Sequence, residues 1–334
     1  MPDARLQTLM SAQHIPGVAL AIQQGDKLVY AGYHGFANLE HRVPVTADTV
    51  FEIASVTKLF TAQAVLQLVQ TGRLTLDTRL ADVLPDLPSA WHMVTVKHCL
   101  THQSGIPNYT ASTTYWDTMR HDKTHREVLA LVDALPLNFT PGDRHAYDNT
   151  GFYLLGLLIE RISGERYGAH LQRVIFAPLG MTQTQCNDYD VLLPHRAQGY
   201  VVEDGVLRNK AFYSISNTFS AGALVSTVPE LLMWRASLFN DSILNADLRR
   251  LWWTPHPSPA GNERDWHFTL GLGWFILDSP LGQFVGHNGG IQGFASAFIH
   301  FPAADLTAIV LCNAGNINEP HTLAFEVISA LKLL

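Results

Sequence analysis

The stretch FEIASVTKLFTAQAVLQLVQ, residues 51–70, combines a helix start with a serine and a lysine at close spacing. Apolar residues recur at helical spacing from Ser55 to Gln70, and Gly72 supplies a stop signal, so we predict a buried helix there. Ser55 and Lys58 are three residues apart, which places their Cβ atoms about 5 to 6 Å apart on one helix face. The lysine can therefore reach the serine hydroxyl.

This serine and lysine have two interpretations. Ser55 can be a nucleophile, because the amides and the dipole of a helix N-terminus favour a developing negative charge. Alternatively, Ser55 is only a helix cap and Lys58 a solvated residue of the first turn. The pattern S-x-x-K is too common to decide between them, so the rest of the chain has to.

Strands are predicted at both ends of the chain. The runs 17–24 and 27–37 are rich in strand-forming residues and are separated by Gly25-Asp26, which is typical of a tight hairpin. A short amphipathic helix precedes them. The later strands are predicted over Phe268–Leu277, Phe284–His287, Phe294–Phe301 and Leu306–Cys312, and a last helix over Pro320–Leu334.

Between about 75 and 195 the patterns are mostly helical and are interrupted by prolines. We therefore predict an α+β fold: one antiparallel sheet, built from both chain ends and flanked by helices, with a helical domain inserted. The sheet domain is expected to comprise residues 1–54 and 200–334, and the mostly helical domain residues 55–199. An active site is expected between them, since clefts between such layers are usual binding sites.

A second motif lies in HAYDNTGFYLLGLLIERISG, residues 145–164, where Tyr147 and Asn149 precede a helix with a buried face. Asn149 can be a simple N-cap and Tyr147 a packed aromatic residue. Alternatively, a phenol beside a lysine can carry protons, because a neighbouring cation lowers the pKa of tyrosine. The amide of Asn149 could donate to a substrate carbonyl.

A third motif lies in FVGHNGGIQGFASAFIHF, residues 284–301. Asn288-Gly289 between two apolar runs is a strong hairpin signal. In the functional interpretation, Gly289 lets a substrate approach the strand, the amide of Gly290 is an oxyanion donor, and His287 faces the cleft.

In this order, the S-x-x-K of residues 55–58, the Y-x-N of residues 147–149 and the H-x-G of residues 287–289 resemble the signatures of the β-lactamase-related serine hydrolases. This superfamily has the penicillin-binding-protein fold and includes class C β-lactamases, DD-peptidases, D-aminopeptidases and esterases. Flanking stretches such as LTHQSGIPNY and IFAPLGMTQT are also similar, and the likeness covers about residues 15–315. The fold implied is the β-lactamase/transpeptidase-like one.

The resemblance also implies roles for these residues. Ser55 would attack a carbonyl and form an acyl-enzyme, while Lys58 and Tyr147 manage its proton. We expect Tyr147 to carry the proton and Lys58 to be the cation that tunes it. The substrate would be bound by Asn149, His287 and Gly289, and the oxyanion hole would be the backbone N–H groups of Ser55 and Gly290. No cofactor and no metal is implied.

Two positions depart from the class C pattern. His287 stands where those enzymes have lysine, and a histidine of ordinary pKa is mostly neutral at pH 7. A histidine at this position resembles the peptidase and esterase branches of the superfamily. Asp148 stands where many relatives have serine or alanine; it would oppose a phenolate if it pointed inward, or recognise a substrate amine. An apolar acyl pocket could be lined by Trp91, Tyr109, Tyr115, Trp116 and Phe219, although some of these are expected in the core.

The resemblance thus predicts a serine hydrolase, either an esterase or a D-amino-acid-type peptidase or amidase. Its substrate would be a small ester, amide or peptide. The alternatives are a β-lactamase or DD-peptidase, and, more distantly, a catalytically silent binding protein on the same fold, since a fold does not establish chemistry.

Composition and local patterns argue against several partners and locations. The net charge of -7, without basic blocks, argues against nucleic acid as a partner. No apolar run approaches the roughly 18 residues of a membrane span. No signal peptide is visible, which predicts a cytoplasmic location, or a periplasmic or secreted one if a leader was removed. The oligomeric state cannot be predicted.

His98 with His102, and His121 with His125, have the spacing of a zinc pair, but neither pair forms an H-E-x-x-H motif, so metal catalysis is disfavoured.

Overall fold

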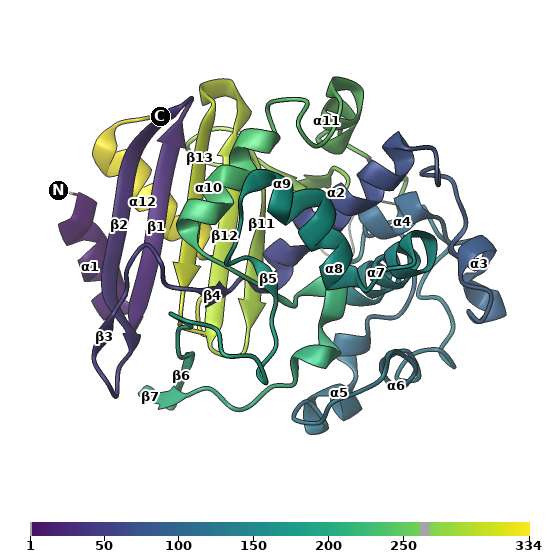
Figure 1. Cartoon of the computed structure of the whole chain (residues 1–334), viewed down its shortest axis with the longest axis horizontal. Coiled ribbons are helices and arrows are strands. Elements are labelled where there is room, and N and C mark those ends of the chain that lie inside the picture. The colour runs from purple at the N-terminus through teal and green to yellow at the C-terminus, as the bar shows by residue number, and fades with distance from the viewer. Residues whose placement is uncertain (1, 261–267) are drawn as a thin grey trace.

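An eight-stranded antiparallel sheet organises the chain, and helices cover both of its faces (Figure 1). The computed structural model describes residues 2–260 and 268–334. In sheet order the strands are β3 (Val43–Pro44), β2 (Lys27–Asn38), β1 (Gly17–Gln24), β13 (Leu306–Cys312), β12 (Phe294–Phe301), β11 (Phe284–Ile291), β10 (Phe275–Leu277) and β9 (Phe268–Leu270). Smaller sheets are formed by β4 (Phe51–Glu52), β8 (Leu224–Ser226) and β5 (Gln185–Cys186), and by β6 (Tyr200–Glu203) and β7 (Val206–Asn209).

The two chain ends meet in the middle of the large sheet, as predicted. Strand β1 pairs antiparallel with β13, in a register that runs from Val18 opposite Cys312 to Gln24 opposite Leu306. Alternate side chains of these strands point to opposite faces, so each strand contributes to two cores. One core lies under the terminal helices α1 (Pro2–Ala12) and α12 (His321–Leu331).

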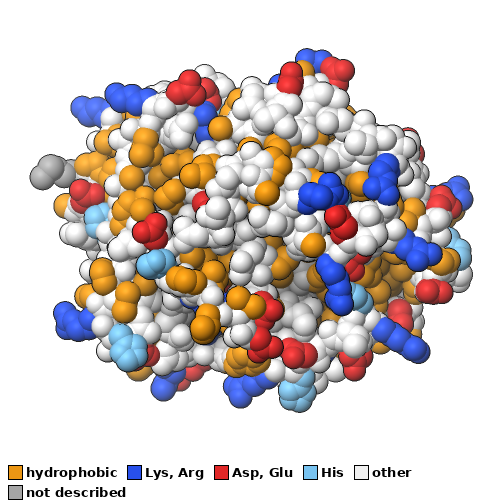
Figure 2. Space-filling view, in the orientation of Figure 1, with side chains coloured by type: hydrophobic (Ala, Val, Ile, Leu, Met, Phe, Trp, Pro, Cys, Tyr) orange, Lys and Arg blue, Asp and Glu red, His pale blue; other side chains and the backbone are white. Residues whose placement is uncertain are grey.

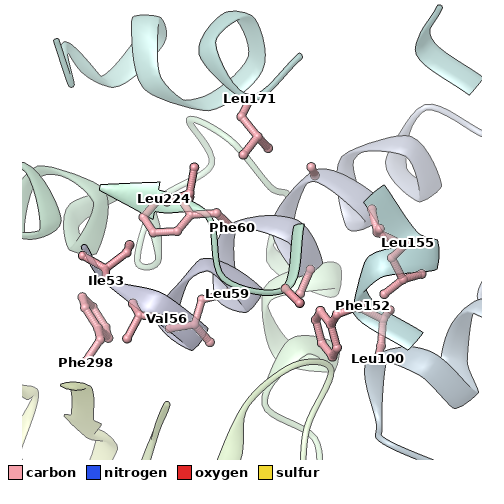
Figure 3. Packing of buried hydrophobic residues seen from close by; sticks show 14 of the residues in the cluster. Ile53, Val56, Leu59, Phe60, Leu100, Phe152, Leu155, Leu171, Leu224 and Phe298 are labelled. Atoms are coloured by element: carbon pink, nitrogen blue, oxygen red, sulfur yellow. The ribbon is translucent and has the colours of Figure 1, made fainter. Parts of the chain in front are cut away.

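The other face of the sheet packs against the helical part of the chain, whose centre is α2 (Thr57–Gln70). This helix is buried on nearly all sides, as its apolar sequence requires. In Figure 3, Leu59 and Phe60 lie between Phe298 of the sheet and Phe152 of α7. The remaining helices are α3 (Leu80–Val83), α4 (Val96–Leu100), α5 (Thr113–Asp117), α6 (His125–Leu129), α7 (Asn149–Ser163), α8 (Tyr167–Leu171), α9 (Ala177–Leu179), α10 (Val228–Ser237) and α11 (Ala246–Trp252).

Two strand predictions near the C-terminus are wrong. The run 268–277 forms two strands, β9 and β10, because Gly273 between them takes a positive φ of 85° and reverses the chain. The predicted hairpin turn at Asn288-Gly289 instead lies inside β11, and the turn comes at Gln292-Gly293, where Gly293 has φ of 78°. Contacts with the rest of the protein override the local turn signal there.

The described surface carries charges of both signs. On the face shown in Figure 2, basic and acidic side chains are interspersed, and no single basic stripe crosses it. Within residues 2–260 and 268–334, no helix combines the length and the apolar character needed to cross a bilayer.

Candidate active site

Ser55 lies in a single 3₁₀ turn, η1 (Ala54–Val56), between β4 and α2. The residue before it, Ala54, has a positive φ of 46°, a conformation that is strained for alanine and is kept only where the surroundings enforce it. Ile53 provides this support. Its carbonyl accepts a hydrogen bond from Ser296 of β12 at 2.7 Å, and its N–H donates to Leu224 of β8 at 3.0 Å. The serine is thus presented from a turn fixed on two sides.

The structure brings Ser55, Lys58 and Tyr147 together. The Oγ of Ser55 lies 3.1 Å from Nζ of Lys58 and 2.8 Å from the hydroxyl oxygen of Tyr147. Tyr147 is 92 residues further along the chain, in the turn before α7. The serine hydroxyl therefore has a group that exchanges protons on either side of it.

Lys58 has two further partners, and both can only accept hydrogen bonds. Its Nζ lies 2.7 Å from the carbonyl oxygen of Ala221 and 2.8 Å from Oδ1 of Asn149. The amide nitrogen of Asn149 donates to Thr110 at 3.0 Å, which keeps Oδ1 turned toward the lysine. Because Lys58 must donate to both oxygens, Ser55 occupies the third position around its nitrogen.

A neutral Lys58 fits these contacts. Its two N–H groups serve Ala221 and Asn149, and its lone pair then points at Ser55. The side chain is 0% exposed, and this burial lowers its pKa well below the usual lysine value, while the Asp148 charge acts in the opposite direction. Lys58 is therefore arranged to accept the serine proton.

The pKa of Tyr147 moves opposite to our expectation. Burial raises it above the usual tyrosine value, and the hydrogen bond to Ser55 only partly offsets this. Nζ of Lys58 lies over the ring of Tyr147, 5.0 Å from its centroid, and burial lowers the pKa of that lysine. The prediction that a cationic Lys58 lowers the tyrosine pKa is wrong, because desolvation outweighs the attraction.

Asp148 has one of the two roles considered for it, because its charge raises the pKa of Tyr147 and so opposes a phenolate. It is the N-cap of α7, where its carboxylate accepts from the N–H groups of Thr150 at 2.7 Å and Gly151 at 2.9 Å, and from the Ser104 hydroxyl at 2.7 Å. Asn149, which sequence allowed as the cap, is instead the first residue of the helix. Burial raises the pKa of Asp148 to about 6 against these hydrogen bonds. Asp148 thus fixes the backbone at the start of α7, between Tyr147 and Asn149.

The third motif forms the strand that borders Ser55. A Cβ built on Gly289 would lie 2.3 Å from the Ile53 carbonyl oxygen and 3.1 Å from the Ser55 nitrogen, so only glycine allows this approach. Gly290 follows on the strand with open space beside it. His287 is buried and also lines the site, whereas Asn288 points to α12, where its amide nitrogen lies 2.8 Å from Nδ1 of His321.

We predict that Gly289→Ala reduces kcat/KM by roughly 100-fold, because β11 must move away from Ser55 and displacements near 1 Å have effects of that size. The matched variant Gly290→Ala adds the same methyl group in open space, and its melting temperature should equal that of the wild type. Kinetics on any cleaved ester, with thermal melting of both variants, make the check. Wild-type kinetics in Gly289→Ala would show that the close approach is not needed.

Two cavities meet at Ser55. The Asn149 cavity, of about 200 Å³, has a wall of aromatic rings, and Ala221 and Gly222 line its other side. The His287 cavity, of about 650 Å³, leads away over Phe268 and Phe275 toward the start of α12. Both are lined by Ser55, Trp116, Tyr147, Gly290, Ile291 and Gln292.

Three of the five aromatic residues proposed for an acyl pocket line the Asn149 cavity: Tyr109, Tyr115 and Trp116. Trp91 lies in the core, and Phe219 packs against Tyr153 and Tyr167 instead. Several lining or supporting residues belong to none of the three motifs and were not predicted: Tyr213, Ala221, Phe275, Gln292 and Glu319. For Ala221, its place in the family-like stretch SAGALVSTVPELLMW was the available signal.

Three of the four spaced histidines, His98, His102 and His125, have other side-chain contacts. Nδ1 of His102 accepts the Asp148 N–H at 3.1 Å, and Nδ1 of His98 accepts the Thr95 N–H at 3.2 Å. His125 contacts the Tyr153 hydroxyl at 2.8 Å. In the part of the chain that the structure describes, no three His, Cys, Asp or Glu residues group as metal ligands.

Comparison with known proteins shows what the whole chain is similar to. The family model "Beta-lactamase" matches residues 2–331. Penicillin-binding protein 4* of Bacillus subtilis is 27% identical over 92% of the chain and 70% of its own length. Protein flp of Staphylococcus aureus is 27% identical over 95% of the chain, which spans 64% of that protein. The crystal structure of D-amino acid amidase from Ochrobactrum anthropi SV3, complexed with D-phenylalanine, has a TM-score of 0.86 and 26% identity, with 99% of both chains covered.

Proposed function

The chain belongs to the Beta-lactamase family, and from this premise we propose that it is a serine hydrolase working through an acyl-enzyme on Ser55. The observation that carries the proposal is the position of Ser55 Oγ, 3.1 Å from Lys58 and 2.8 Å from Tyr147, where two cavities meet. A silent binding protein would have no need for a buried lysine held against a serine.

Lys58 is the general base in this proposal. The Oγ of Ser55 bonds to the substrate carbonyl carbon as its proton passes to the lysine nitrogen. The leaving group departs with a proton from the Tyr147 hydroxyl, and the proton held by Lys58 then restores the tyrosine. Water attacks the acyl-enzyme by the same route and frees the acid. The raised pKa of Tyr147 and the lowered pKa of Lys58 both support this assignment.

The oxyanion hole is formed by the backbone N–H groups of Ser55 and Gly290, which both line the two cavities. Asn149 lies in the wall of the Asn149 cavity alone, so this cavity takes the acyl group, whose carbonyl or amide the side chain can contact. The His287 cavity then takes the leaving group, which the proton donor Tyr147 can reach because it lines both cavities.

The acyl cavity favours small apolar acyl groups. Aromatic rings from Tyr109, Tyr115, Trp116 and Tyr213 line its 200 Å³, and none of the described side chains that line it is charged. Esters and amides of small apolar acids, or of amino acids with apolar side chains, are therefore the substrates that we propose.

A substrate panel tests the function. We expect kcat/KM to be highest for p-nitrophenyl esters, lower for D-Ala p-nitroanilide and a D-Ala-D-Ala peptide, and lowest for a chromogenic cephalosporin. The reason is that His287 replaces the lysine of class C enzymes and burial lowers its pKa to about 3, so it offers a β-lactam carboxylate no positive charge. If the cephalosporin ranked first by orders of magnitude, the alternative of a β-lactamase would be correct.

A further inference from the structure

The side chain of His287 is oriented by a bond to its own strand. Its Nδ1 lies 2.5 Å from the carbonyl oxygen of Asn288, which can only accept, so Nδ1 carries the hydrogen. The second nitrogen, Nε2, then has a bare lone pair. His287 is 4% exposed, and its Nε2 has no hydrogen-bond partner among the described residues. The residue is thus a buried acceptor without a donor.

His287 keeps this state at any ordinary pH. Burial lowers its pKa to about 3, and the nearby Lys58 acts in the same direction. The aromatic rings of Phe275 and Tyr147, at centroid distances of 5.0 and 6.1 Å, occupy two of its sides. The open side is the His287 cavity, which it lines. Because Nε2 itself is buried, a ligand in that cavity meets an uncharged ring at this position rather than a cation.

The far end of the same cavity is also an acceptor. Glu319, just ahead of α12, lines it and is the one lining residue with a formal charge among those described for either cavity. No lysine or arginine is among the described lining residues. An anionic group entering the cavity would therefore meet a neutral histidine and a carboxylate, with no cation among the lining residues that the structure describes.

We propose that the His287 cavity selects leaving groups that present N–H donors, such as a carboxamide or an amine, and rejects leaving groups that end in a carboxylate. This inference rests on the proposed function, because it assigns the leaving-group side of the same site. Its volume of about 650 Å³ also fits a leaving group much larger than ammonia or methanol. The substrate class is thus a compound that joins a small apolar acyl group to an elongated, uncharged or basic leaving group.

A matched pair of esters tests the selection. Phenylacetate esters of lactamide and of lactate share the acyl group and differ only in a carboxamide or a carboxylate on the leaving alcohol. In each, Ser55 Oγ bonds to the carbonyl carbon, the bond to the alcohol oxygen breaks, and that oxygen takes the Tyr147 proton. After each rate is divided by that of alkaline hydrolysis, we expect kcat/KM to be at least about 10-fold higher for the lactamide ester. Equal rates, or preference for lactate, would overturn the inference.

Two variants localise the effect. His287→Lys places a cation in the cavity and should reverse the preference, so that the lactate ester becomes the better substrate. Glu319→Gln, at an exposed position where folding is not at risk, removes the carboxylate and should raise kcat/KM for the lactate ester several-fold, so that the preference for the lactamide ester narrows. The control is Glu326→Gln: this carboxylate of α12 pairs with Arg5 and lines neither cavity, so it should alter neither ester. A Glu319→Gln enzyme with wild-type selectivity would remove Glu319 from the proposal.

A third ester, p-nitrophenyl phenylacetate, distinguishes a failure of the leaving-group inference from a failure of the proposed serine hydrolase function. If the wild type hydrolyses it but does not distinguish the lactate pair, the leaving-group inference fails and the serine hydrolase stands. If the wild type hydrolyses none of the three esters and Ser55 takes up no acyl group in intact-mass spectrometry, the proposed function itself fails.

Discussion

Ser55→Ala is expected to abolish hydrolysis, with a fall in kcat/KM of about 10⁴-fold or more. Without Oγ there is no atom to carry the acyl group, and the partners of Ser55, Lys58 and Tyr147, are left facing an empty position. Intact-mass spectrometry with a fluorophosphonate probe gives the second measurement. The wild type should gain the mass of one phosphonyl group, and the variant should gain none.

Ser242→Ala is the matched control for this experiment. Ser242 is exposed and lines neither cavity, so both its activity and its labelling should equal those of the wild type. Melting temperatures then separate loss of chemistry from loss of folding. An adduct of unchanged yield in Ser55→Ala, or none in the wild type, would assign the nucleophile elsewhere or deny that there is one.

The second large effect concerns Lys58. Lys58→Arg keeps a positive charge at the site but cannot give up its proton, so a general base is lost. We expect kcat/KM to fall about 10³-fold, within the range usual for removing a general base. If Lys58 were only the cation that tunes Tyr147, the arginine variant would keep a large part of its activity, and Tyr147 would be the base.

The pH profile makes the same distinction without a mutation. Since Lys58 must be neutral to accept the serine proton, kcat/KM should rise with pH as the lysine loses its proton. Burial lowers its pKa, so this rise should lie well below the ordinary lysine value of about 10.4. Tyr147→Phe, which keeps the ring and removes the proton donor, should reduce kcat/KM by about 10²-fold and leave the position of the rise in place. A rise that vanished in Tyr147→Phe would assign it to the tyrosine.

The sequence predicted which residues meet but not how their protons are arranged. The order of the three motifs was enough to place Ser55, Lys58 and Tyr147 in one site, as the distances now show. The hydrogen bonding of Lys58 depends on the backbone carbonyl of Ala221, 163 residues away. Every residue type has such a carbonyl, so the identity of residue 221 does not predict this contact. Desolvation, which reverses the expected pKa of Tyr147, likewise appears only when the neighbours are known.

Local signals failed where a tertiary contact competes with them. Asn288-Gly289 is a good turn pair, yet Asn288 bonds to His321 and Gly289 packs on Ile53, so the strand continues through both. Asp148 was ambiguous because the same residue type serves as a helix cap, a charge and a ligand. Glu319 lies in a segment without any motif, so nothing in the sequence connected it to the site.

The pairing of β1 with β13 has a consequence for how the protein is made. Val18 finds its partner Cys312 only after that residue has left the ribosome, so the central pair of strands closes late. Until then β11 and β12 have no completed sheet to join. The residues Gly289 and Gly290 of β11 therefore cannot pack beside the turn that contains Ser55. Nascent chains should therefore stay inert until Cys312 has left the ribosome, and the onset of hydrolysis would time the closing of the central strands.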